Sequence, residues 1–298
     1  MPLYRRTFLR STLVGGATLC LNLKADHGFA AERWSNLSHE FAKIEVASGG
    51  RLGVAVLNTQ TEARAAYRPD ERFPLCSTFK LLAVAAILKR VDAGQETLNR
   101  RIAFGPKDLV VNSRTTSARV GDGAMTLGEL CEAAMVVSDN TAGNLLLAAL
   151  GGPAGLTAFA RSLGDSVSRL DRWEPELNEA LPGDPRDTTT PTAMLGNIHR
   201  VVLGDVLTQA SRQELMTWLL GNKTGDTRLR ARLPKTWRVG DKTGAGERGT
   251  TNDVGLFWPP KGGPLIVSAY LTGCPDTNER QNATIAAVGE VVAAAWPS

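Results

Sequence analysis

The sequence predicts a mixed α+β fold, in which one antiparallel β-sheet is built from both ends of the chain and flanked by helices. Two observations support this prediction: strand patterns occupy both ends of the chain, and helical patterns fill its middle. We therefore expect a mainly helical subdomain inserted into a sheet subdomain, with the active site between them. The predicted strands are Arg51–Asn58, Thr61–Tyr67, Trp237–Thr243, Thr250–Trp258 and Leu265–Thr272.

The helices are predicted from apolar periodicity. The run FKLLAVAAILKRVDAG after Thr78 is apolar on nearly every side and ends at Gly94, which predicts a buried helix. By contrast, Arg169–Thr190 is rich in Pro, Asp and Gly and has no periodicity, and such a long segment inside a compact domain usually serves a function. Further helical patterns cover Leu127–Val137, Thr141–Leu150, Gly155–Leu163, Pro191–Leu203, Ser211–Leu220 and Ala283–Ala295.

The first thirty residues are predicted to be an export signal peptide and not part of the fold. Arg5 and Arg6 precede a short, weakly apolar stretch, and small residues suited to a signal peptidase end it at Ala30. Paired arginines followed by Phe8 and Leu9 resemble a twin-arginine signal; an ordinary secretory signal is the alternative. Both signals place the protein outside the bacterial cytoplasm.

The rest of the chain, residues 31–298, is expected to form the sheet subdomain from 31–70 and 225–298 and the helical subdomain from 71–224. The chain has 34 basic and 30 acidic side chains, and the leader accounts for four of the former and one of the latter, so the net charge of the body is +1. This balance gives no electrostatic footprint for nucleic acid or an anionic membrane. No apolar run approaches the roughly 18 residues of a membrane span, so after signal cleavage we expect no membrane contact.

Several familiar sites are excluded by the residues present. His39 and His199 each stand alone, so neither a Ser-His-Asp triad nor a histidine zinc site is expected. Cys76, Cys131 and Cys274 are odd in number and widely spaced, so we expect buried thiols and no disulfide framework. The sequence therefore predicts no metal and no cofactor.

Ser77 and Lys80 form the first candidate catalytic pair. Ser77 stands where a loop gives way to the buried helix, and Lys80 lies one turn further along the same face. An amine held in an apolar helix loses its proton more readily than a solvated one, so it can activate a serine hydroxyl. Only Ser77, among the serines of this chain, has a lysine at this spacing. A capping serine beside a surface lysine is the alternative.

Two further short motifs complete the set. Ser138-Asp139-Asn140 ends one helical run and precedes the next, where a helix cap is the plainer interpretation. Lys242-Thr243-Gly244 ends a predicted strand, whereas the same triplet at Lys223 follows a helix and is expected in a solvated turn; we therefore choose Lys242. Gly244–Gly249 also matches G-x-G-x-x-G, but a strand follows it where a dinucleotide site needs a helix, so it is expected to be a turn between strands.

These three motifs, in this order, resemble the S-x-x-K, S-D-N and K-T-G set of the serine β-lactamase and penicillin-binding superfamily. The run RWEPELN from Arg172, continuing to PRDTTTP, is similar to the omega loop of class A β-lactamases. The resemblance covers about residues 33–296. It implies an enzyme that hydrolyses the β-lactam amide of penicillins and cephalosporins through a serine acyl-enzyme, acts as a monomer in the periplasm of a Gram-negative bacterium, and confers antibiotic resistance.

The resemblance also implies the catalytic roles. Ser77 attacks the β-lactam carbonyl, and the amides of Ser77 and Ala245 form the oxyanion hole. Either Lys80 or Glu174, the latter through a water, is the base for acylation. Ser138 relays a proton to the ring nitrogen as the amide breaks.

The same resemblance implies the residues that hold substrate and loop. Glu174 and Asn178 position the deacylating water. Arg172 and Asp187 form an ion pair that closes the omega loop, residues 172–187. Residues implied in substrate binding are Asn140, Asn178, Lys242, Thr243, Gly244, Ala245 and Arg228.

The sequence departs from the family pattern at three places. Thr251 stands where many members have an arginine that binds the carboxylate, and Arg228 matches the alternative that others use. The segment LVVNSR lacks the expected aromatic residue near the site. Cys76 and Cys131 each match half of a family disulfide, but the partner positions hold Gly246 and Val84, so specialised carbapenem hydrolysis loses its main sequence support.

Two alternatives share part of the motif set. A penicillin-sensitive D-alanyl-D-alanine peptidase or transpeptidase would lack the Glu174 loop and would stall as an acyl-enzyme. A β-lactam sensor domain would also become acylated, but it is normally fused to a membrane segment.

Overall fold

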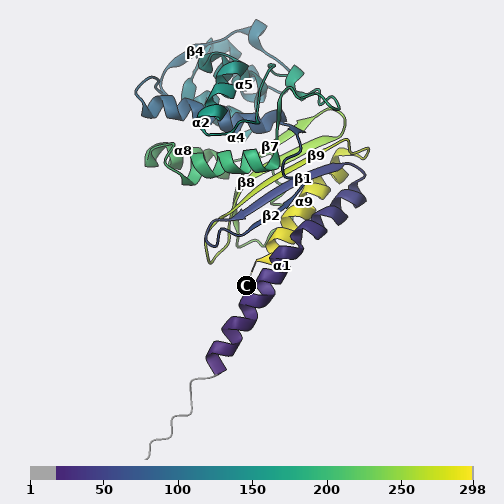
Figure 1. Ribbon diagram of the computed structural model, residues 1–298. Coiled ribbons are helices and arrows are strands. Elements are labelled where there is room, and N and C mark those ends of the chain that lie inside the picture. Colours follow the sequence, from purple (N-terminus) through teal and green to yellow (C-terminus); the bar gives the residue numbers. More distant parts are fainter. Residues whose placement is uncertain (1–17, 297–298) are drawn as a thin grey trace, which may run out of the picture.

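The central element of the computed structural model, which describes residues 18–296, is a five-stranded sheet with the order β2-β1-β9-β8-β7 (Figure 1). Every pairing in it is antiparallel, and β1 pairs with β9 along its whole length, from Arg51 opposite Thr272 to Asn58 opposite Leu265. The two ends of the chain therefore build one sheet, as predicted. The strands are β1 (Arg51–Asn58), β2 (Arg64–Tyr67), β7 (Arg238–Gly246), β8 (Thr250–Trp258) and β9 (Leu265–Thr272).

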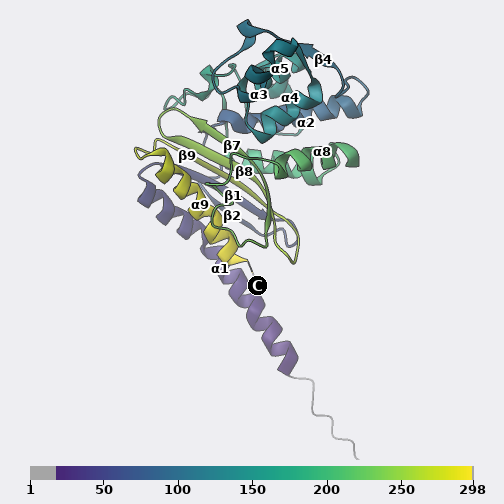
Figure 2. The ribbon, with the colours of Figure 1, turned by 180° about the vertical axis from the view of Figure 1, so that it is seen from behind.

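One face of the sheet is covered by the two terminal helices, α1 (Thr18–Ser48) and α9 (Asn278–Ala295), which lie side by side in both views (Figures 1 and 2). Leu37 and Phe41 of α1 are fully buried in an apolar cluster with sheet and α9 side chains. No helix was predicted in this part of the chain. The boundary expected at residue 30 falls inside the continuous α1, and whether the chain is cleaved there stays a prediction. Arg5 and Arg6 lie outside the described residues.

The helical subdomain lies on the opposite side of the sheet from α1 and α9 (Figure 1). Helix α7 (Pro191–Ile198) lies within residues 71–224, the predicted helical subdomain, and packs against β1 and β9 of the sheet. Helix α8 (Gln209–Leu220) packs against β7, so these two helices join the subdomains. The elements are α2 (Phe79–Asp92), α3 (Arg114–Arg119), α4 (Leu127–Val136), α5 (Asn140–Leu150), α6 (Pro153–Ser162), α7 (Pro191–Ile198), α8 (Gln209–Leu220), and the short strand pairs β3 (Phe73–Pro74) with β6 (Thr188–Thr189) and β4 (Arg101–Ala103) with β5 (Ala124–Thr126).

The predicted buried helix is α2, whose residues from Phe79 to Leu88 are all buried. It begins directly after a 3₁₀ turn, Cys76–Thr78, that contacts both β7 and β8. This junction matters for the site, because it places the start of α2 against the edge strand of the sheet.

Some element ends differ from the prediction. β2 begins at Arg64 because residues 59–63 form the hairpin turn. The glycine-rich segment after Lys242 stays in β7 as far as Gly246, so the turn is confined to residues 247–249. No single helix within 18–296 is long and apolar enough to cross a membrane; α5 and α6, which are bent by 69° at their junction, reach that length only as a pair.

Candidate active site

The Ser77 hydroxyl lies beside the Lys80 amine, as the spacing of the two residues predicted. Ser77 sits in the 3₁₀ turn and Lys80 in the first turn of α2, and Lys80 Nζ donates a hydrogen bond of 3.0 Å to Ser77 Oγ. Lys80 has no exposed surface. The alternative of a surface lysine beside a capping serine is therefore wrong.

Three further groups surround the Lys80 amine. Nζ donates to the backbone carbonyl of Ser138 at 2.9 Å and to Oδ1 of Asn140 at 2.7 Å, and it pairs with Oε1 of Glu174 at 3.0 Å. Both side chains of this ion pair are completely buried. Since an uncompensated buried charge is costly in free energy, the amine and the carboxylate can both be buried because each compensates the charge of the other.

Glu174 is held by its backbone as well as by its carboxylate. The Glu174–Pro175 peptide bond is cis. Asn144 of α5 accepts from the Glu174 amide and donates to its carbonyl, both at 2.9 Å. The carboxylate lies 3.3 Å from Ser77 Oγ through Oε1, while Oε2 accepts from Nδ2 of Asn178. Glu174 is thus directed at the Ser77 hydroxyl.

Sequence reasoning missed Asn144, although a signal was available. Asn144 lies four residues after Asn140, so both amides share one face of α5 and point at the same site. Glu176, the other carboxylate of this stretch, is exposed, as expected.

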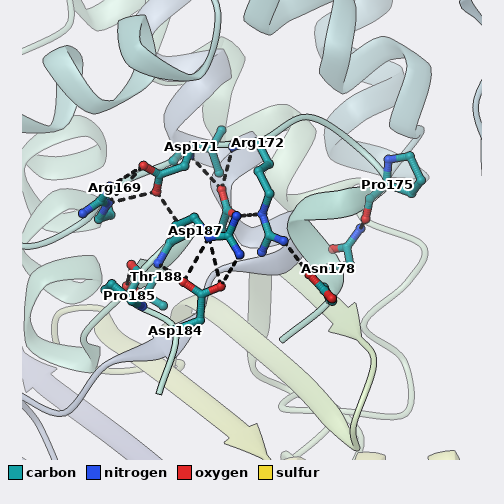
Figure 3. A network of polar contacts seen from close by, with 12 residues as sticks. Arg169, Asp171, Arg172, Pro175, Asn178, Asp184, Pro185, Asp187 and Thr188 are labelled. Carbon is teal, nitrogen blue, oxygen red and sulfur yellow. Dashed lines mark hydrogen bonds and ion pairs between the residues drawn. The ribbon is translucent and has the colours of Figure 1, made fainter. Parts of the chain in front are cut away.

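The predicted omega loop, residues 172–187, is closed by the predicted ion pair, with Arg172 Nε 2.6 Å from Asp187 Oδ2 (Figure 3). Asp187 is buried, and its Oδ1 also accepts from the amides of Asp171 and Arg172 at 2.7 and 2.9 Å. Arg172 reaches a second carboxylate, Glu179, at 2.6 Å. Because these bonds join the two ends of the loop to its middle, they restrain the short 3₁₀ turn Glu176–Asn178 that follows Glu174.

Ser138 and Asn140 enter the site from the junction of α4 and α5. Asp139, buried between them, caps α5 by accepting from Ala142 N at 2.9 Å, and it also accepts from the amides of Thr115 and Thr116. Asp139 therefore shapes the turn while its neighbours face the site. The cap interpretation of this motif is correct for Asp139, and it does not extend to Ser138 and Asn140.

Lys242 and Thr243 reach the same place from β7. Lys242 Nζ donates to Ser138 Oγ at 3.0 Å. Thr243 Oγ1 lies 2.5 Å from Thr224 Oγ1, so the second copy of the triplet is not wholly solvated as expected: Lys223 is exposed, but Thr224 packs against the site.

Gly244 lies close to residues 75–78, the turn that carries the proposed nucleophile Ser77 and that we call the nucleophile turn. A Cβ at this position would lie 3.1 Å from the Leu75 carbonyl oxygen and 3.2 Å from Cys76 Cβ, so β7 and the turn are nearly in backbone contact. Ala245, the next residue, is exposed. The amides of Ser77 and Ala245 thus belong to two segments that lie directly side by side.

Arg228 is half-buried and joins β7 to β8. Its Nη1 donates to the carbonyls of Gly244 and Asn252 at 2.7 and 2.8 Å, and its Nε donates to Asn282 at 2.9 Å. Thr251 is buried. The guanidinium is therefore positioned by β7, β8 and α9 together, a role that the sequence did not reveal.

Cys76, Cys131 and Cys274 are buried and unbridged, as expected. Cys76 Sγ faces Gly246, where a Cβ would lie only 2.7 Å away. Burial raises the pKa of the Cys76 thiol far above its ordinary value, so this thiol stays protonated at neutral pH although it adjoins the nucleophile.

Burial shifts the pKa values of two charged residues in and beside β7. Burial, with the positive charges of Lys80 and Arg228, holds the pKa of Lys242 well below its ordinary value. On the neighbouring strand, burial and the negative charge of Asp241 raise the pKa of the Asp253 carboxyl well above its ordinary value. A negatively charged group that binds beside Lys242 would therefore stabilise the charged form of its amine.

The fold and the site together define a serine acyl-transfer enzyme: one serine, one buried lysine, one buried carboxylate and a second serine–lysine pair converge between a sheet edge and a helical subdomain. The site draws on five separate segments of the chain. Their agreement identifies a class of enzyme more specifically than any of the motifs does alone.

Comparisons with known proteins agree with this class. The model of the β-lactamase enzyme family matches residues 36–296. β-Lactamase Toho-1 from Escherichia coli is 48% identical over 258 residues, which cover 87% of this chain and 88% of that protein. β-Lactamase OXY-2 from Klebsiella oxytoca is 47% identical over 256 residues, 86% of this chain and 88% of that protein.

Solved structures agree as well. An ancestral class A β-lactamase (GNCA) has a TM-score of 0.86 at 61% identity and covers 87% of this chain and 100% of its own. A putative class A β-lactamase, PenP from Rhodopseudomonas palustris, has a TM-score of 0.86 at 56% identity, with 88% and 100% covered. The chain belongs to the class A serine β-lactamases.

The raised pKa of Asp253 leads to a prediction about stability. Because the folded state keeps this carboxyl protonated where the unfolded chain ionises it, its contribution to stability is full below about pH 4 and is lost as pH rises toward the folded pKa. Asp253→Asn removes this loss. We expect the free energy of unfolding of the variant to gain on the wild type as pH rises above 4, by at most about 1.4 kcal/mol per pH unit. Urea denaturation at a series of pH values measures this, and parallel curves would contradict it.

Proposed function

We propose that this enzyme hydrolyses the β-lactam amide of penicillins and cephalosporins through an acyl-enzyme on Ser77. One observation carries the proposal: the buried Lys80 amine lies 3.0 Å from both Ser77 Oγ and Glu174 Oε1. The same three groups can therefore remove the serine proton and later activate a water. Antibiotic resistance in the bacterium that makes the enzyme follows from this activity.

Acylation begins when Ser77 Oγ attacks the β-lactam carbonyl carbon. The serine proton passes to Glu174 through a water, or to Lys80 once the amine has given a proton to Glu174 Oε1, 3.0 Å away. We assign the oxyanion hole to the backbone amides of Ser77 and Ala245, which the contact of Gly244 with the nucleophile turn brings together.

The C–N bond then breaks as Ser138 protonates the ring nitrogen. Lys242 donates to Ser138 Oγ at 3.0 Å, which leaves the hydroxyl hydrogen of Ser138 free to be donated to the substrate. The proton taken from Ser77 replaces the one that Ser138 gives up, passing from Glu174 through Lys80, so that Glu174 is a carboxylate again before deacylation. The product of this step is a Ser77 ester with an opened ring.

Deacylation needs a water that is held and deprotonated beside the ester. Glu174 is the buried carboxylate 3.3 Å from Ser77 Oγ. Asn178 donates to Glu174 through Nδ2, and its Oδ1 is buried without a hydrogen-bond partner in the structure, which supports a water at this point. Attack by this water forms the new C–O bond, breaks the ester and returns the proton to Ser77.

Substrate recognition rests on polar groups around this centre. Asn140 accepts from Lys80 through Oδ1, so its Nδ2 is the group that donates to the side-chain amide of the substrate. Lys242, Thr243 and Arg228 bind the carboxylate of penicillins and cephalosporins. The lowered pKa of Lys242 supports this assignment, since a bound carboxylate would offset the effects of burial and of the Lys80 and Arg228 charges.

Export to the periplasm by the twin-arginine route is part of the same proposal and rests on Arg5 and Arg6. Relatives from Gram-negative bacteria support the location. Replacing both arginines by lysine should leave active enzyme in the cytoplasm, and normal periplasmic activity would show that the general secretory route is used instead.

The proposed roles of Glu174 and Glu176 predict opposite effects. Glu174→Ala should still be acylated by a good penicillin, yet it should hydrolyse the ester orders of magnitude more slowly, so a stoichiometric adduct accumulates. Glu176→Ala, two residues away and exposed, is the matched control and should turn over nearly normally. Stopped-flow acylation and steady-state rates measure both.

A wild-type enzyme that stops after one equivalent of penicillin would overturn hydrolysis. It would then behave as a penicillin-sensitive peptidase or a sensor.

Variants of Arg228 and of its partner Asn282 distinguish the effect of the Arg228 charge from the effect of the hydrogen bond that positions it. Arg228→Ala should raise KM for penicillins about tenfold to a hundredfold, equivalent to 1.5–3 kcal/mol at most, because it removes a charged contact to the carboxylate. Asn282→Ala removes only the bond to Arg228 Nε and leaves the charge in place, so its KM should change much less. Steady-state kinetics test this. An unchanged kcat/KM in Arg228→Ala would show that Lys242 and Thr243 suffice.

A further inference from the structure

Asn252, a residue of β8 that the mechanism above does not use, holds the backbone that leads into the nucleophile. Its side chain has no exposed surface, and its Nδ2 donates to the carbonyl oxygens of Pro74 at 2.9 Å and Leu75 at 3.3 Å. These carbonyls lie three and two residues before Ser77. One side chain of the sheet thus restrains two successive peptide planes of this segment.

The restrained segment contains a strained residue. Cys76 has a φ of 44°, a left-handed conformation that side chains other than glycine rarely adopt. Such conformations persist where the surroundings over-determine them, and they occur at functional sites. Because Cys76 precedes Ser77, its backbone angles set the direction in which the Ser77 amide points.

The Leu75 carbonyl is the common acceptor of this arrangement. Besides Asn252, it accepts from Thr78 Oγ1 at 2.6 Å and from the Thr78 amide at 3.2 Å. Since the Thr78 hydroxyl donates to Leu75, the hydroxyl of Tyr270, 3.2 Å away, donates to Thr78. Asn252 and Tyr270 therefore hold the nucleophile turn from two neighbouring strands.

We propose that Asn252 is a positioning residue for the oxyanion hole: by fixing the Pro74 and Leu75 carbonyls, it aims the Ser77 amide at the substrate's carbonyl oxygen. The inference rests on the proposed function, in which that amide is one of two oxyanion donors. Loss of one such donor costs about 10²–10³ in rate in comparable enzymes. A donor that is present but misdirected should cost less, roughly tenfold or more.

Asn197 of α7 offers a matched control that tests whether the role of Asn252 is purely structural. Both side chains have no exposed surface, both donate through Nδ2, and in both Oδ1 is buried without a hydrogen-bond partner in the structure. Asn197 donates to Asp165, far along the chain from the nucleophile turn. Asn197→Ala therefore reports what a buried asparagine contributes to stability alone.

The test compares the acyl-enzymes of four proteins: Glu174→Ala, in which the ester accumulates, and the same variant carrying Asn252→Ala, Asn252→Asp or Asn197→Ala. Asn252→Asp keeps the shape and removes the donor, and Asn252→Ala removes the side chain if the aspartate hinders folding. Difference infrared spectroscopy with a ¹³C-labelled penicillin carbonyl measures how strongly the oxyanion hole polarises the ester. Stopped-flow measurements give the acylation rate constant at saturating substrate.

We expect both Asn252 variants to shift the ester carbonyl band to higher wavenumber and to slow acylation roughly tenfold or more, with the concentration for half-saturation changed by less than about threefold. Asn197→Ala should lower the melting temperature without moving the band. An unchanged band and acylation rate in the folded Asn252 variants would overturn the inference. If neither the wild-type enzyme nor the parent Glu174→Ala forms any adduct on Ser77, the proposed function is overturned instead, and the inference with it.

Discussion

The buried ion pair between Lys80 and Glu174 is the interaction on which the rest of the site depends. Neither charge is exposed, so each needs its partner, and Lys80 Nζ also donates to oxygens of Ser77, Ser138 and Asn140, so that its three hydrogens are shared among four acceptors. These acceptors come from separate segments. The requirement to satisfy one ammonium group therefore brings the nucleophile turn, the α4–α5 junction and the omega loop to one point. The same requirement keeps the amine close enough to Ser77 to take part in proton transfer.

The constraints on this pair extend outward in two directions. On one side, Asn144 fixes the backbone of Glu174, and the Arg172–Asp187 pair ties the ends of the omega loop together. On the other side, Gly244 of the edge strand β7 packs closely against the nucleophile turn, and Arg228 joins that strand to β8. The sheet subdomain therefore forms one side of the site through β7, while the helical subdomain supplies most of the polar groups. The distances between the proposed catalytic groups thus depend on how the two subdomains pack against each other.

Much of the fold could be predicted from periodicity, because the sheet strands and α2 bury long apolar stretches. The site could be predicted where chemistry coincides with a short motif, as at Ser77 and Lys80. What the sequence could not reveal are groups whose partners are distant in the chain or backbone atoms. Asn252 acts on backbone carbonyls, so no residue type marks its targets. The spacing of Asn144 from Asn140 marks its face of α5, but nothing in the sequence marks its target, the Glu174 backbone. The helix α1 was missed because its visible signal was that of a leader, although Leu37 and Phe41 pack into the core.

The account makes Ser77 a nucleophile that is both acylated and released, and one measurement tests this most directly. Wild-type enzyme is mixed with benzylpenicillin and quenched at successive times, and intact-mass spectrometry with peptide mapping follows the covalent species. We predict a single penicilloyl ester on Ser77 that forms, then disappears as the substrate is consumed, and that is absent in Ser77→Ala. An ester mapped to any other residue, or substrate turnover that persists in Ser77→Ala, would contradict the account.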